Sequence, residues 1–359
     1  MEIYIHQQDH WPDFTWDHEQ LAMLLGKVRN EQGKLVGKMA SLGFDLQHEA
    51  FLETFTLNII KTTEIEGIIL NPEQVRSSAA RRLGIDVAGL TPSDRNIDGV
   101  VDMMFDATRN FNQPLTKERL FDWHYSLFPT GRSGVSKISV GDWRDDSTGP
   151  MQVVSGAIGK ENVHYQAPAA ARLAQEMNVF IEWINEGGEN IDLVLKAGIA
   201  HLWFVTLHPF DDGNGRIARA ITDMLLAKSD GSEERFYSMS AQIQKEHNMY
   251  YAILEKTQKG NLDITEWLSW FLTCLLHALN SSHEILSNVI YKHNFWNMHS
   301  LNIRNERQKL LVNKLLDGFY GKLTTSDTAL RDIQDLMRKN ILRKAEGGGR
   351  STSYELVDI

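Results

Sequence analysis

The sequence predicts a mostly α-helical protein with a small β-hairpin and a helix-plus-hairpin module at its C-terminal end. Apolar residues recur at helical spacing in most segments, for example Leu21, Leu24, Leu25 and Val28. Only Met151–Val154 and Val163–Tyr165 have β-prone composition in the middle of the chain, with Gly156 and Gly159 between them. The third observation is the ending, where the helical pattern of 328–337 is followed by two short apolar segments around Gly347–Gly349.

Composition limits the class of protein. The chain has 359 residues, 42% of them hydrophobic and 23% charged, which is typical of globular domains. Its net charge of −10 argues against broad non-specific nucleic-acid binding, which needs clustered Lys and Arg. A single cysteine excludes an intramolecular disulfide and suits a reducing cytosol. Because no signal peptide or membrane-spanning run is evident, we expect a soluble cytoplasmic protein.

The helices are expected in order along the chain. Residues 1–20 are interpreted as a strand or extended arm with an aromatic anchor at 11–16. Helices follow from about Asp17, through 51–66, from Pro72, after Asp94, and after the cap Thr116. Residues 131–150 are expected to be loop, and Pro168 opens a helix to Asn185. Further helices are predicted at 191–207, 217–228, 237–255, 264–279, 303–319 and 328–337.

The stretch from His208 to Arg219 carries the chemistry. Gly213, Asn214 and Gly215 precede a helix, so backbone N–H groups there can bind an anion such as a phosphate. Arg216 and Arg219 lie one helical turn apart and suit a polyphosphate.

Two further groups in this stretch suit phosphate chemistry. Asp212 is a candidate Mg²⁺ ligand, and Asp211 beside it offers a second carboxylate. His208 is the one group here that can accept a proton near neutral pH. The combination favours attack by a hydroxyl on a nucleotide phosphate. Taken alone, the Gly-Asn-Gly segment could be an ordinary turn and the His-Pro pair an ordinary helix terminator. These interpretations are weaker when all the parts occur together within twelve residues.

This stretch resembles the signature of the Fic family, His-x-Phe-x-(Asp/Glu)-Gly-Asn-Gly-Arg-x-x-Arg, at every defined position. The resemblance implies a helical Fic core and transfer of AMP from ATP to a Ser, Thr or Tyr hydroxyl of a protein, including the enzyme itself. It implies His208 as base, Asp212 as Mg²⁺ ligand and Gly213–Gly215 as anion hole. The two motif arginines would bind the phosphates, and Phe210 would anchor the loop. ATP and Mg²⁺ are the expected substrate and cofactor.

A second resemblance concerns the end of the second predicted helix. Thr62-x-x-x-Glu66-Gly67 is similar to the family's inhibitory motif, whose glutamate pairs with the second motif arginine, here Arg219. From the residues alone, two glutamates in a last helical turn oppose the helix dipole by about 0.3–1 kcal/mol each, and a solvated helix end is the competing interpretation. The resemblance implies instead that Glu66 holds the enzyme inactive.

Other positions are carried over from the family by their place in the chain. Met151–His164 corresponds to the flap, a hairpin that aligns the target segment. The nucleotide contacts expected outside the motif are Val153, Val154, Ser155, Gly156, Tyr250 and Gln258.

The resemblance also implies a division of the chain into three parts. These are an N-terminal region (1–90) with the inhibitory helix, a Fic catalytic domain (91–285) and a winged-helix-like domain (286–359). Relatives carry a longer connection after the stretch Gly318–Thr324. In this sequence the connection to the helix that follows is shorter, which argues against DNA binding by the C-terminal module.

Alternatives to AMP addition remain at this point. One is transfer of another nucleotide or phosphate-containing group, and another is hydrolytic removal of AMP from a modified protein. A third, from a different class, is a winged-helix DNA-binding regulator whose Fic domain senses nucleotide. The expected partner is a hydroxyl-bearing protein, and a homodimer is compatible with the resemblance. No membrane partner is expected.

Overall fold

The structure is a computed structural model that describes residues 3–85, 91–156, 160, 162–188, 190–303, 305–316, 327–345 and 353–357. The chain divides into two compact units, residues 1–285 and residues 286–359. The second unit starts at the residue where the sequence places the C-terminal module. Residues 1–90 and 91–285 share the first unit, so their separation into two domains stays a prediction.

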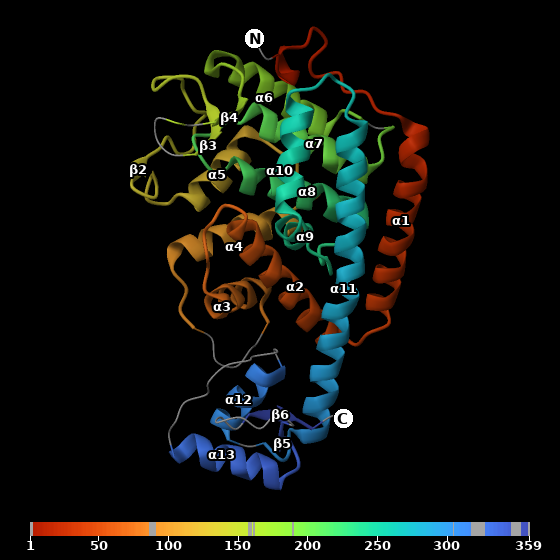
Figure 1. The fold of residues 1–359 in the computed structure, drawn as a ribbon, viewed down its shortest axis with the longest axis vertical. Coiled ribbons are helices and arrows are strands. Elements are labelled where there is room, and N and C mark those ends of the chain that lie inside the picture. The colour runs from red at the N-terminus through yellow and green to blue at the C-terminus, as the bar shows by residue number, and fades with distance from the viewer. Residues whose placement is uncertain are drawn as a thin grey trace. The chain divides into compact units, whose positions relative to one another are not determined.

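The first half of the larger unit is a series of capped helices (Figure 1). After a 3₁₀ turn η1 (Ile5–Gln7) come α1 (His18–Ala40), α2 (Phe44–Glu64), α3 (Pro72–Leu83), α4 (Arg95–Arg109) and α5 (Lys117–Leu127). Side chains of Asp17, Asn71, Asp94 and Thr116 accept hydrogen bonds from the first backbone N–H groups of α1, α3, α4 and α5. These caps satisfy donors that a helix start leaves unpaired, which explains why the helices begin there.

Two short hairpins and the central helices follow. The hairpins are β1 (Arg132–Ser133) with β2 (Ser136–Lys137) and β3 (Gln152–Ser155) with β4 (Asn162–Gln166), both antiparallel. The remaining helices are α6 (Ala170–Asn185), α7 (Leu193–Leu207), α8 (Asn214–Asp230), α9 (Met239–Lys245), α10 (His247–Gln258) and α11 (Thr265–His299).

The core of this unit is built around α7. Every residue of α7 from Val194 to Leu207 is buried, as expected for a helix that is apolar on all sides. Its one lysine, Lys196, donates a hydrogen bond from its ammonium group to the carbonyl of Gly187 at 2.6 Å, so this buried donor has an acceptor. Helix α8 packs against α7, and the loop of residues 208–213 joins the two. The candidate chemistry therefore lies at the end of the most buried helix.

The structure corrects four details of the predicted elements. The N-terminal segment forms the 3₁₀ turn η1 rather than a strand, although Trp11 and Phe14 do anchor it against Trp203 of α7. The predicted loop 131–150 contains the hairpin β1–β2. The single helix predicted over 237–255 is two helices, α9 and α10, and α11 runs well beyond residue 279.

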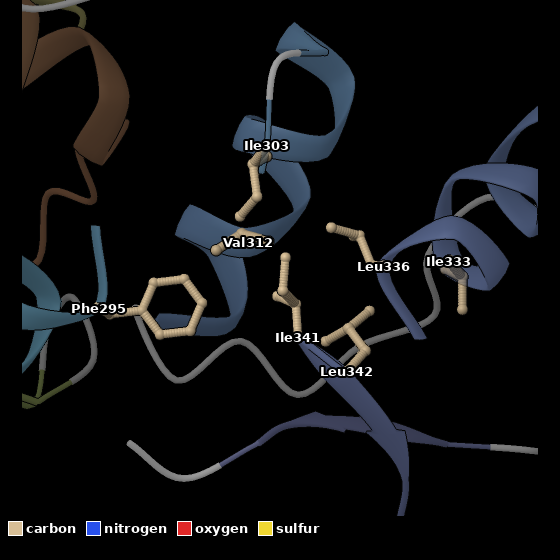
Figure 2. Packing of buried hydrophobic residues seen from close by; sticks show 7 residues of the cluster. All are labelled: Phe295, Ile303, Val312, Ile333, Leu336, Ile341 and Leu342. Atoms are coloured by element: carbon tan, nitrogen blue, oxygen red, sulfur yellow. The ribbon is translucent and has the colours of Figure 1, made fainter. Parts of the chain in front are cut away.

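The smaller unit holds α12 (Glu306–Leu316), α13 (Asp327–Arg338) and the antiparallel strands β5 (Leu342–Lys344) and β6 (Tyr354–Leu356). Helices followed by a hairpin match the predicted winged-helix-like order. Figure 2 shows the apolar side chains of its core, contributed by the end of α11, by α12, by α13 and by the start of the hairpin. The stretch Gly318–Thr324, the short connection predicted after it and the glycine turn Gly347–Gly349 lie outside the described residues.

Within the described ranges, no helix is both long enough and apolar enough to cross a bilayer.

Candidate functional site

The loop between α7 and α8 is closed by one side chain. The amide of Asn214 accepts a hydrogen bond from the Phe210 N–H at 3.0 Å and donates one to the Phe210 carbonyl at 2.7 Å. Phe210 is fully buried and stacks on the ring of His124 with 4.1 Å between centroids. His124 in turn donates from Nε2 to the carbonyl of Asp212 at 3.2 Å. The Asn214 amide and the buried Phe210 ring therefore fix the conformation of the loop.

His208 terminates α7 in the left-handed conformation, with φ 50° and ψ 57°. Few non-glycine residues adopt it, so the surrounding structure must hold it in place. The Nδ1 atom lies 3.3 Å from the Val205 carbonyl, which can only accept, so Nδ1 carries the proton. Burial lowers the pKa of His208 from 6.5 to about 4. The imidazole is thus neutral at physiological pH, and its Nε2 lone pair is able to accept a proton.

A buried arginine outside the motif holds this residue. Arg144 donates from Nε to the His208 carbonyl at 2.7 Å, and its backbone N–H donates to the Pro209 carbonyl at 2.9 Å. Its two remaining nitrogens donate to Asp146 and to the Pro168 carbonyl. Neither composition nor spacing singled out Arg144, because it lies in a segment interpreted only as loop.

The start of α8 is shaped for an anion. Gly213 has φ 83°, and a Cβ atom built there would lie 2.9 Å from the ring of Phe128. The first N–H groups of a helix have no partner within the helix and carry partial positive charge. Arg216 extends over the Phe128 ring at 5.0 Å, is nearly fully buried, and its Nε has no hydrogen-bond partner in the described part of the chain. Burial lowers the pKa of Arg216, while the negative charges of Asp212 and Glu66 oppose that shift.

Arg219 is engaged by the end of α2. Its Nε donates to the Thr62 hydroxyl and its Nη2 to the Thr62 carbonyl, both at 2.7 Å. The same Nη2 donates to the Glu66 carboxylate at 2.6 Å. The Arg219 side chain is 3% exposed and that of Glu66 is 30% exposed. Gly67, with φ 76°, reverses the chain directly after Glu66, a conformation that favours glycine.

Glu66 also blocks the space at the start of α8. A Cβ atom built on Gly215 would lie only 2.3 Å from the Glu66 Oε1. The carboxylate thus lies directly against the backbone of the second residue of α8. An anionic side chain from the turn directly after α2 therefore occupies the position where the N-terminus of α8 and Arg219 together attract negative charge.

Asp212 lies at the edge of the same loop. One carboxylate oxygen accepts the Gly213 N–H at 2.5 Å, and the other accepts the Ser133 hydroxyl from the β1–β2 hairpin. Asp211 accepts the backbone N–H of Ser139 at 2.9 Å. Among the described residues no group of three or more His, Cys, Asp or Glu side chains is arranged to hold a metal ion. These residues fit a Mg²⁺ site in which one carboxylate, that of Asp212, and the phosphates of a substrate bind the ion together.

The other sequence-predicted contacts are placed in two groups. Val153, Val154, Ser155 and Gly156 lie on or directly after β3, an exposed strand of the hairpin. That strand pairs only with β4 in the described residues, so its other edge is open. Tyr250 and Gln258 are buried on α10.

The polar groups of Tyr250 and Gln258 already have partners inside the protein. The Tyr250 hydroxyl lies 3.0 Å from His201 Nε2, and Gln258 donates to the Thr206 hydroxyl at 3.3 Å. Contact of these two residues with adenosine stays a prediction.

Comparison with known proteins agrees with this geometry. The Fic/DOC family model matches residues 114–226, and a domain of unknown function, DUF4172, matches residues 4–85. The chain is 27% identical over 212 residues to a protein adenylyltransferase fic-1 of Caenorhabditis briggsae and 25% identical over 232 residues to the protein adenylyltransferase Fic of Aedes aegypti. These matches cover 57% and 64% of this chain but only 39% and 42% of the two relatives.

Solved structures show the same fold. A Fic family protein from Desulfovibrio desulfuricans aligns with a TM-score of 0.56 and 18% identity, over 97% of this chain and 98% of that chain. Residues 134–508 of Fic-1 from C. elegans align with a TM-score of 0.51 and 20% identity, over 74% of this chain and 73% of that one. The fold is thus the Fic fold, mostly helical with small hairpins. The chain is a Fic/DOC family protein with an N-terminal DUF4172 domain.

Proposed function

We propose that this protein is an adenylyltransferase that transfers AMP from ATP to a hydroxyl group of a protein, and that Glu66 holds it inactive. The observation that carries the proposal is the set of contacts from Thr62 and Glu66 to Arg219 at the start of α8. A phosphate-binding helix start with a carboxylate lying against it is suited to a nucleotide enzyme in its inhibited state. The names of the distant relatives, protein adenylyltransferases, support the same reaction class.

His208 supplies the base. Its neutral ring, with the proton on Nδ1, leaves Nε2 free to take the proton of the acceptor hydroxyl. The hydroxyl oxygen then forms a bond to the α-phosphorus of ATP, and the bond from that phosphorus to the bridging oxygen of pyrophosphate breaks. Arg144 and Asn214 keep the histidine and its loop in one geometry, so little ordering is needed at the moment of reaction.

The start of α8 stabilises the negative charge on the phosphates of ATP. The N–H groups of the Gly213–Gly215 turn and the unpaired Nε of Arg216 are the donors suited to phosphate oxygens. Asp212 would hold Mg²⁺ together with the phosphates, and the metal would neutralise charge on the leaving pyrophosphate. Among the described residues the two glycines are also the positions where a side chain would collide with Phe128 or with the Glu66 carboxylate.

Inhibition follows from competition for Arg219. Its Nη2 cannot donate to a phosphate while it donates to both Thr62 and Glu66. Because the arginine is nearly fully buried, removing Glu66 leaves a buried charge without its carboxylate, which costs more than the roughly 0–1 kcal/mol of an exposed ion pair. ATP then binds with its terminal phosphate misplaced, or Glu66 must leave.

The test of the reaction is mass spectrometry of Glu66→Gly protein incubated with Mg²⁺ and separately with ATP, GTP, CTP and UTP. We expect a mass increase equal to one AMP with ATP, on the protein itself or on an acceptor in lysate. An increase with another nucleotide only would assign a different transferred group. Loss of AMP from previously modified protein, with no addition, would assign the hydrolytic reaction instead.

A further inference from the structure

Arg144 connects three parts of the molecule that the reaction must hold in register. Its guanidinium is surrounded by the His208 carbonyl, the Pro168 carbonyl and the Asp146 carboxylate, at 2.7, 2.5 and 2.9 Å. Each of these partners belongs to a different segment. The Arg144 side chain is buried, whereas the Asp146 side chain is 33% exposed, so the bond to the Pro168 carbonyl is the one buried at both ends.

Two of the three partners are the stems of the β3–β4 hairpin. Asp146 precedes the first strand, which begins at Gln152, and Pro168 follows the second strand, which ends at Gln166. Asp146 is itself fixed, because its other oxygen accepts the Ala170 N–H at the start of α6 at 2.6 Å. The third partner is the backbone of the general base, which is held in a strained left-handed conformation.

We propose that Arg144 is a positioning residue that couples the hairpin to the base, setting the distance between the His208 imidazole and the strand along which an acceptor is presented. This role rests on the proposed function. It differs from ordinary packing because the arginine bonds the carbonyl of His208 directly and leaves ATP-binding groups untouched. Loss of the guanidinium would remove the side-chain link between the base and the hairpin, and leave the bonds from the Arg144 N–H to the Pro209 carbonyl and from the Tyr165 hydroxyl to the Thr206 carbonyl. The position of the imidazole relative to the hairpin would then be less well defined, and a misplacement of about 1 Å can cost about 100-fold in rate.

The decisive variant is Arg144→Lys in the Glu66→Gly protein, with Arg119→Lys as matched control. Arg119 makes a comparable set of contacts, to the Asp106 carboxylate and to the carbonyls of Asp106 and Gln113. Its Nη1 reaches α8 at the sulfur of Met224 (3.5 Å), five residues beyond Arg219. In both cases lysine keeps the positive charge but lacks the planar set of N–H donors of the guanidinium. We expect AMP transfer to fall at least tenfold in Arg144→Lys and to change less than threefold in Arg119→Lys. Thermal stability should fall in both, and ATP binding in neither.

A second measurement does not depend on transfer. In the Glu66→Gly protein the groups that act on the His208 charge are Arg144, which lowers its pKa, and Asp212, which raises it. Arg144→Gln should therefore raise the pKa of the His208 ring relative to the Glu66→Gly parent. Proton NMR of the ring as a function of pH measures both values. Arg119→Gln should leave it unchanged.

The outcomes separate the two proposals. Absence of any transfer in Glu66→Gly protein with Arg144 intact contradicts the proposed function, whereas the NMR result still tests the contact. Equal transfer in Arg144→Lys and Arg119→Lys, or loss of ATP binding together with rate in Arg144→Lys, would make Arg144 a general structural residue. If Arg144→Lys does not fold, Asp146→Ala removes the acceptor for Arg144 together with the one for the Ala170 N–H, and should lower transfer at least threefold at unchanged ATP affinity. No decrease in that variant would overturn the coupling.

Discussion

The carboxylate of Glu66 lies 2.6 Å from the guanidinium of Arg219, although 153 residues separate them in the sequence. Thr62, one helical turn before Glu66, binds the same guanidinium through both its hydroxyl and its carbonyl. The last turn of α2 and the turn after it thus make three hydrogen bonds to one buried arginine. A glutamate near a helix C-terminus, unfavourable for the helix dipole, is explained by that arginine.

Thr62→Val should release part of the inhibition. The substitution keeps the shape of the side chain but leaves Arg219 Nε, a buried charged donor, without the hydroxyl that accepts from it. Such a loss costs about 1–3 kcal/mol in the inhibited state. We expect basal AMP transfer between that of the wild type and that of Glu66→Gly, measured with α-labelled ATP. Transfer at the wild-type level would show that the Thr62 hydroxyl takes no part in inhibition.

His208→Ala should abolish AMP transfer and leave ATP binding within about threefold, because the base is not a phosphate ligand. Binding is measured by isothermal titration with ATP and Mg²⁺, in the Glu66→Gly protein and in the double variant. A parallel loss of binding would identify His208 as a structural residue.

The pH dependence of transfer should report the lowered pKa of His208. A base with a pKa of about 4 is already deprotonated well below neutrality, so activity is lost only as pH falls toward that value. We expect kcat/KM of Glu66→Gly protein to stay level from about pH 6 to about pH 8. An acidic limb centred on 6.5, the ordinary value for histidine, would show that the ring is not desolvated in the free enzyme.

Asn214→Asp tests the closure of the loop. The aspartate still accepts from the Phe210 N–H but cannot donate to the Phe210 carbonyl, and it adds a negative charge at the start of α8. The buried carbonyl loses its donor at a cost of about 1–3 kcal/mol, and the charge repels phosphate. We expect a lower melting temperature and at least tenfold weaker ATP binding. Unchanged ATP affinity would contradict the assignment of this turn to phosphate binding.

Features that depend on neighbouring residues could be predicted from the sequence, whereas contacts between distant residues could not. Motifs that are continuous in the chain, such as 208–219, predicted both the loop and the helix start that the structure shows, because capping and turn chemistry are local. The pairing of Glu66 with Arg219 was accessible only through a family resemblance, since nothing in the spacing of residues 62–67 points to a partner 150 residues away.

Arg144 and Ser133 show where sequence reasoning fails. Each contacts the motif from a segment without periodicity, and their partners are mainly backbone carbonyls or a single carboxylate. Backbone acceptors are present at every position, so they leave no trace in the pattern of side chains. The misassigned N-terminal strand has a similar cause, because Ile5 and His6 are buried by tertiary contacts rather than by an alternating sheet face.

The central claim is tested most directly by the initial rate of AMP incorporation from α-labelled ATP into wild-type, Glu66→Gly and Glu66→Gly/His208→Ala proteins at equal concentration. We predict at least a tenfold higher rate in Glu66→Gly than in the wild type, and none in the double variant. The tenfold bound corresponds to a difference of about 1.4 kcal/mol in activation free energy. Equal rates in wild type and Glu66→Gly would contradict the account.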